Sequence, residues 1–191
     1  MKIKNEIIFF LSYALYLVFC IFDASFFTKY IYVLEKPIML ICVALLMVYE
    51  LIRKEKNIKI KELLFIICLF AAILIMINHL NGAKMLPLLF FVYSSRNIEF
   101  KKIAKVTIIV SSIALGAIVL SALIGVIENY KIITNEYGII RKRTYLGFRY
   151  SLYPQAIVIN ITLCYIYCCK NKLSLIKVIL LIGINYLFYY Y

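Results

Sequence analysis

Long apolar stretches are the feature that most limits what this chain can fold into. A helix that crosses a lipid bilayer needs about 20 mostly apolar residues, and the sequence contains seven candidates for such a helix. The predicted spans cover residues 7–22, 38–52, 63–77, 85–95, 103–127, 153–169 and 173–191. The fourth span carries Pro87 in its first turn, where the missing N–H breaks no hydrogen bond. The pattern predicts an all-α, polytopic membrane bundle that forms one transmembrane domain over residues 1–191.

The composition excludes an ordinary soluble enzyme. Of the 191 residues, 65% are apolar and 16% are charged, whereas a soluble domain is about half apolar and about a quarter charged. The net charge of +13 would suggest nucleic acid as a partner in a soluble protein, but here the basic residues form short runs between apolar stretches. We therefore expect the chain to lie in a lipid bilayer and to have no nucleic-acid partner.

The positions of the basic residues predict the topology. Fourteen of the 22 Lys and Arg residues lie in the N-terminus and in the connections after the second, fourth and sixth predicted spans. The first and third connections hold only three. Because Lys and Arg accumulate in cytoplasmic loops, this distribution predicts a cytoplasmic N-terminus. The alternation also requires the short fourth span to be a real span.

The loop at residues 128–152 departs from this rule. It is predicted to lie outside, yet it holds five basic residues against the acidic Glu128 and Glu136, which could pair with them. The basic residues are Lys131, Arg141, Lys142, Arg143 and Arg149. An arginine side chain presents a planar fork of donors that can bind two phosphate oxygens at once.

Aromatic residues lie beside the arginines of this loop. Tyr145, Phe148 and Tyr150 could stack on sugar rings while the arginines bind an anionic headgroup that is attached to a lipid. A loop that only binds the phosphate of anionic lipids explains the same residues equally well. Composition alone leaves these two interpretations open.

The segment Arg143-Thr144-Tyr145-Leu146-Gly147-Phe148, which leads into a span through Pro154, resembles a motif of Wzy-type oligosaccharide repeat-unit polymerases. These are the O-antigen and capsular polysaccharide polymerases, which are related to O-antigen ligases. Residues 82–87 and 95–103, at the two ends of the fourth span, are also similar to Gram-positive members of that family. The resemblance implies a multi-pass glycosyltransferase of the bacterial cytoplasmic (plasma) membrane that acts in polysaccharide, capsule or exopolysaccharide biosynthesis for the cell envelope.

The resemblance also implies the substrate and the reaction. Undecaprenyl-diphosphate-linked oligosaccharide would be transferred to another repeat unit on the outer face of the membrane, without a metal or cofactor. A chain-length regulator is the protein partner that it implies. The leaving pyrophosphate gains negative charge in the transition state, and guanidinium groups can stabilise that charge.

Site residues follow from the resemblance and from this chemistry. We expect Arg143 to be catalytic first, because it stands in the matched motif, followed by Arg141 and Arg149. The residues expected to bind substrate are Lys142, Tyr145, Phe148 and Tyr150. No histidine follows the motif, so the candidate base is His79, the one histidine of the sequence, although an interfacial role explains it as well.

Other expectations concern the extent of the chain and its alternatives. The last predicted span ends at Tyr191, and the family it resembles is longer, so we expect an N-terminal fragment of a polymerase that could be inactive on its own. The six cysteines have no metal-ligand spacing, so no metal site is expected. Two alternative functions remain. The chain could be a membrane transporter or flippase component for lipid-linked oligosaccharide, or it could be a non-catalytic membrane subunit.

Overall fold

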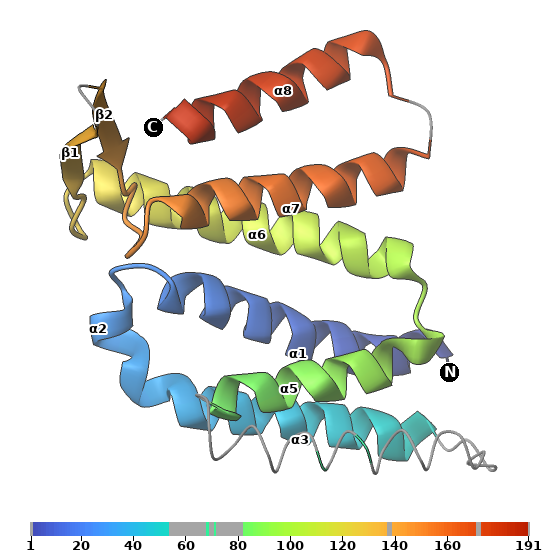
Figure 1. Cartoon of the computed structure of the whole chain (residues 1–191). Helices are drawn as coiled ribbons and strands as arrows, with labels where there is room; N and C mark the ends of the chain where they lie inside the picture. The colour runs from blue at the N-terminus through green and yellow to red at the C-terminus, as the bar shows by residue number, and fades with distance from the viewer. Residues whose placement is uncertain are drawn as a thin grey trace. The chain divides into compact units, whose positions relative to one another are not determined.

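A computed structural model of the chain describes residues 2–53, 68, 71, 82–136, 139–170 and 173–190. The described part is mostly helical (Figure 1). Its long helices are α1 (Lys2–Asp23), α3 (Glu35–Arg53), α5 (Gly82–Ser94), α6 (Phe100–Leu123), α7 (Leu152–Cys169) and α8 (Leu175–Tyr190). Three short elements join them, namely α2 (Thr28–Ile31), η1 (Tyr32–Leu34) and η2 (Ser95–Asn97).

Helices occupy six of the seven predicted spans. The third predicted span, at residues 63–77, lies outside the described residues except for Cys68 and Ala71, which are helical. By length and composition, four described segments can cross a membrane: Glu6–Asp23, Thr28–Ile52, Phe100–Leu123 and Leu152–Cys169. Helix α8 is apolar but shorter. These helices indicate a membrane protein, whereas the count of seven spans and the orientation stay predictions.

The predicted outer loop contains a β-hairpin that the all-α prediction did not include. Strands β1 (Lys131–Glu136) and β2 (Ile139–Thr144) pair antiparallel, with Lys131 opposite Thr144 and Glu136 opposite Ile139. The physical reason is local, because each strand carries adjacent isoleucines, whose β-branched side chains favour extended backbone. Hydropathy over a span-length window does not detect such short segments.

The backbone contacts divide the chain into two compact units. The first unit holds Met1–Tyr16 and Val33–Glu99, and the second holds Leu17–Tyr32 and Phe100–Tyr191. Helix α1 therefore contributes its N-terminal part to the first unit and its C-terminal part to the second. A single transmembrane domain over residues 1–191 stays a prediction.

Aromatic rings and a buried hydrogen bond hold the first unit together. Phe9 is buried and contacts the rings of Tyr49 on α3 and Phe91 on α5, with centroids 5.7 and 5.8 Å away. The Ser12 hydroxyl donates a hydrogen bond of 3.0 Å to the carbonyl oxygen of Cys42. These contacts join α1, α3 and α5 into one packed group.

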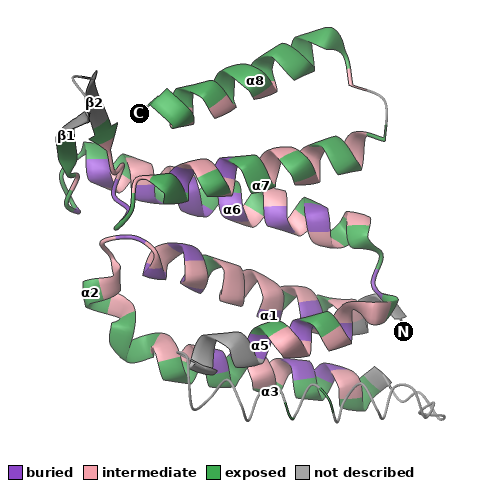
Figure 2. Ribbon diagram, in the orientation of Figure 1, coloured by how far each residue is buried: buried purple, intermediate pink, exposed green. Residues whose placement is uncertain are grey.

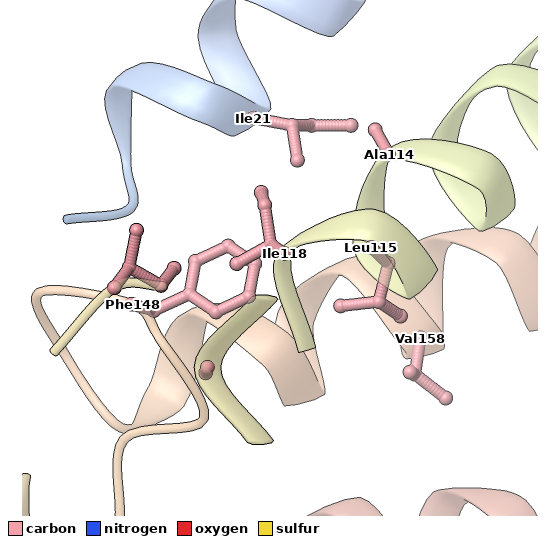
Figure 3. Close-up of a cluster of buried hydrophobic side chains, with 8 residues drawn as sticks. Ile21, Ala114, Leu115, Ile118, Phe148 and Val158 are labelled. Atoms are coloured by element: carbon pink, nitrogen blue, oxygen red, sulfur yellow. The ribbon is translucent and has the colours of Figure 1, made fainter. Parts of the chain in front are cut away.

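The core of the second unit forms where α6 packs against α7 and the end of α1. Figure 3 shows the ring of Phe148 beside Ile118, with Ile21, Ala114, Leu115 and Val158 in the same cluster. Burial decreases from there toward the C-terminus, and no residue of α8 is buried (Figure 2). The basic loop is thus attached to the best-packed part of its unit.

Candidate functional site

The basic residues of the loop lie on β2 and just after it. Arg141, Lys142 and Arg143 take successive positions of β2, opposite Thr134, Ile133 and Ile132 of β1. The side chains of Arg141 and Lys142 are outside the described part of the structure, as is the whole of His79. Arg143 and Arg149 are both exposed. The two arginines with described side chains are therefore accessible to an anionic ligand.

A tight turn at Leu146 and Gly147 separates these two arginines. The Phe148 N–H donates a hydrogen bond of 2.9 Å to the Tyr145 carbonyl oxygen, which closes the turn. Leu146 has φ 49° and Gly147 has φ 83°, both in the left-handed region that a type I′ turn requires. A Cβ atom on Gly147 would lie 2.8 Å from Ile127 Cδ1 and 2.9 Å from Ala122 Cβ. Only glycine fits this position without displacing its neighbours.

Phe148 is completely buried in the core of the second unit. Its sequence neighbours suggested a ring that stacks on sugar, but in this conformation its faces are covered by protein. The reason is the turn, which directs Phe148 toward α6 and leaves Arg149 and Tyr150 exposed. The Leu-Gly-Phe part of the motif therefore anchors the loop.

The corner segment, residues 24–26 between α1 and α2, pairs with the residues around this turn. Ser25 and Phe148 form an antiparallel bridge. The Phe26 N–H donates to the Gly147 carbonyl oxygen at 2.9 Å, and the Arg149 N–H donates to the Ala24 carbonyl oxygen at 3.0 Å. Ser25 is buried, and its hydroxyl donates to the Phe22 carbonyl oxygen at 2.6 Å. The backbone of Arg149 is therefore held while its side chain is exposed.

Polar contacts connect α2, which follows the corner segment, to the start of the loop. The Lys29 ammonium lies 3.3 Å from the Glu128 carboxylate, and the Tyr130 hydroxyl donates to that carboxylate at 2.5 Å. The Tyr130 hydroxyl and the Lys29 ammonium lower the pKa of Glu128, and the hydrogen bond to Glu128 raises the pKa of Tyr130. Exposed pairs of this kind add little stability, so this contact links α2 to the start of the loop but contributes little to the free energy of folding.

Aromatic rings continue from these polar contacts into the hairpin. The ring of Tyr130 packs edge-on against Phe26, with centroids 5.1 Å apart, and its carbonyl oxygen accepts a hydrogen bond of 2.9 Å from the Tyr145 N–H. Tyr145 is half-buried, while Tyr150 is exposed and packs edge-on against Tyr153. Of the three rings expected to bind substrate, Tyr150 is the most accessible.

Two parts of this site were missed at the level of sequence. The sequence offered loop arginines as possible partners of Glu128, and the structure pairs this carboxylate with Lys29, 99 positions away. No local pattern signals such a contact. The hairpin had a signal in the isoleucine pairs at residues 132–133 and 139–140, on either side of Gly138. Among the residues that the structure describes, no group of His, Cys, Asp and Glu could hold a metal ion.

The arrangement as a whole presents accessible positive charge on a backbone that several hydrogen bonds hold in place. Such a site can bind phosphate or diphosphate without a metal. In comparisons with known proteins, no protein-family model, curated protein or solved structure matched this chain.

Proposed function

We propose that this membrane protein is a polysaccharide repeat-unit polymerase, or the N-terminal part of one, that acts on undecaprenyl-diphosphate-linked oligosaccharide. It would transfer the glycan of one lipid-linked unit to a sugar hydroxyl of another, and the basic loop would bind the leaving diphosphate. One observation carries this proposal: the arginine-bearing segment around Arg143 and Arg149 is held by backbone hydrogen bonds and leads directly into the apolar helix α7.

A fixed backbone supports the proposed chemistry. Charge that develops on a leaving diphosphate is stabilised best by donors that need no rearrangement during the reaction. The Arg149 N–H is bonded to Ala24, and the turn before it is packed against Ile127 and Ala122. The guanidinium groups of Arg143 and Arg149 remain exposed for the ligand.

The position of the loop at a helix start supports a lipid-linked substrate. Helix α7 begins at Leu152, three positions after Arg149; the exposed Tyr150 precedes the helix and the exposed Tyr153 lies in its first turn. Tyrosines at this level are typical of the membrane interface. A ligand with a charged headgroup and a hydrocarbon tail would meet arginine, tyrosine and apolar surface in that order.

The test is replacement of Arg143 by alanine and by lysine in the intact gene, in the host that makes the glycan. If Arg143 binds the diphosphate with its fork of donors, Arg143→Ala will abolish long-chain glycan while single lipid-linked units accumulate. Arg143→Lys will restore only part of the chain length, because lysine lacks the fork. The readouts are glycan length on gels and the amount of lipid-linked single units.

Lys131→Ala is the matched control, because Lys131 is an exposed basic residue on the paired strand of the same hairpin. It removes the same charge and should leave long-chain glycan intact. Normal chain length in Arg143→Ala would rule out the polymerase mechanism. Loss of lipid-linked units from the outer leaflet, with none to polymerise, would instead favour a flippase component.

A further inference from the structure

A groove with a volume of about 450 Å³ lies between α7 and α8, both in the second unit. Helix α8 returns alongside α7 (Figure 1). On α7 the lining residues recur at helical spacing, at Gln155, Ile159, Thr162 and Ile166. The lining on α8 runs from Val178 to Tyr189. The groove therefore follows the two helices along most of their length.

One polar contact joins the two helices within this apolar groove. The Asn185 amide nitrogen donates a hydrogen bond of 2.8 Å to the Thr162 hydroxyl and another of 2.8 Å to the Leu181 carbonyl oxygen. An amide in hydrocarbon needs such partners, because no water is present to replace them. With both N–H donors used, Asn185 holds α8 to α7, and the rest of the lining is apolar apart from Gln155 and the two tyrosines.

The groove is about as long as one phospholipid acyl chain. The lining on α7 extends from Gln155 to Ile166, a distance of about 17 Å at 1.5 Å per residue. Half of a hydrocarbon core that is about 30 Å thick is about 15 Å. An acyl chain of one phospholipid matches this length, whereas a long polyprenyl chain far exceeds it.

The charge at one end of the groove indicates which phospholipid fits. Gln155 lies at the end that follows the exposed Arg149 and Tyr150, and Tyr189 of α8 lines the groove. The sequence after Glu136 contains no Asp or Glu. A headgroup at that end therefore meets arginine and no acidic residue of the same segment, which favours a negative charge.

We propose that the groove between α7 and α8 binds one acyl chain of an acidic phospholipid, with Arg149 holding the headgroup. The groove concerns a structural lipid and not a substrate, although the site shares Arg149 with the proposed diphosphate site. The vesicle experiment below measures lipid binding alone, so it can fail or succeed separately from the proposed polymerase reaction. Such a site predicts a lipid that stays with the chain at a defined position, in contrast to the exchanging lipid around the rest of the bundle.

The natural chain contains no tryptophan, so a single introduced tryptophan is a unique fluorescent probe. Tyr189→Trp places it in the lining of the groove, and Tyr190→Trp places it on the next residue, which does not line the groove. The side chains of Tyr189 and Tyr190 are 71% and 70% exposed, so the two tryptophan variants are matched in their exposure. Both would be reconstituted in phosphatidylcholine vesicles that contain a fixed fraction of dibrominated phosphatidylglycerol or of dibrominated phosphatidylcholine, and the quenching measured.

Quenching of Tyr189→Trp should show about a fivefold preference for the acidic brominated lipid, the factor that one arginine near such a headgroup supplies. Tyr190→Trp should be quenched equally by both lipids. Adding Arg149→Gln to Tyr189→Trp should remove the preference for the acidic lipid. The substitution keeps the hydrogen bond from the backbone N–H of residue 149 to the Ala24 carbonyl oxygen.

Three results would overturn the assignment. Equal quenching of Tyr189→Trp by both lipids would mean that the groove holds no selected lipid. A preference that survives Arg149→Gln would exclude Arg149 as the headgroup ligand. Relief of quenching by a small amount of unlabelled undecaprenyl diphosphate would show that the groove belongs to that lipid.

Discussion

Gly147 allows the sharpest prediction for a single residue. Replacing it by alanine places a Cβ atom within 2.9 Å of the side chains of Ile127 and Ala122, in a backbone with φ 83°. Left-handed strain and overpacking each cost about 1–3 kcal/mol, so Gly147→Ala should lower the free energy of unfolding by at least about 1 kcal/mol. Denaturant unfolding of the purified protein in detergent would measure this.

Gly116→Ala is the control for that substitution. A Cβ atom on Gly116, in the middle of α6, has no neighbouring atom within 4 Å, and alanine favours helix over glycine by about 1 kcal/mol. The control should therefore unfold at the same or slightly higher denaturant concentration. If both variants lose stability equally, the close packing around Gly147 is not what makes glycine necessary there.

The residues around Gly147 also show what single positions reveal about function. The arginine and aromatic residues of this segment indicate a binding site, but the type of a residue does not show whether its ring is exposed or buried. Phe148 and Tyr150 are two positions apart in sequence, yet the first is fully buried and the second is 62% exposed. The difference arises from the turn at Leu146 and Gly147, whose geometry depends on contacts with α6 that lie far away in sequence.

At the scale of elements, Arg96 and Glu50 join η2 to α3 in the first unit. The two guanidinium nitrogens lie 3.2 and 3.3 Å from the two carboxylate oxygens, and both side chains are 23% exposed. Arg96 also lies over the ring of Tyr93, 4.0 Å from its centroid. A two-point ion pair that is mostly removed from water is much stronger than a surface pair.

A double-mutant cycle would measure how strongly this ion pair couples the two elements. Arg96→Met and Glu50→Gln should each destabilise the protein, and the double variant should be less damaging than the sum by about 1–2 kcal/mol. The same cycle at Lys29 and Glu128, whose side chains are 51% and 47% exposed, should give a smaller coupling. Equal couplings at the two sites would contradict the role we assign to the pair of Glu50 and Arg96.

The elements differ in how well the sequence predicts them. Apolar stretches anticipate α1, α3, α5, α6, α7 and α8, because an apolar segment in a membrane must satisfy its own backbone hydrogen bonds, and a helix does so. The hairpin, α2 and the corner segment were not predicted. Their form depends on the register between strands and on pairs such as Ser25 with Phe148, which are 123 positions apart, and neither feature leaves a periodic trace in one sequence.

At the scale of the whole molecule, the positions of the basic residues are the part of the sequence that says most about topology and function. Most of them indicate the topology, and a second group lies in the loop that bears β2. The structure gives the second group a defined local arrangement, since the hairpin, the turn and the corner segment are linked by hydrogen bonds. The side of the membrane on which that arrangement lies is a separate property, and the orientation of α6 determines it.

Helix α6 makes the topology testable with two positions. Its 24 residues span about 36 Å, which exceeds a hydrocarbon core of about 30 Å, so its two ends should lie on opposite sides. In a variant with all six cysteines replaced by alanine, Tyr150→Cys should react with a membrane-impermeant maleimide in intact cells. Lys102→Cys, near the start of α6, should react only after the membrane is permeabilised. Reaction at both positions in intact cells would exclude α6 as a span, and the reverse pattern would place the basic loop in the cytoplasm, where it could not act on a substrate at the outer face.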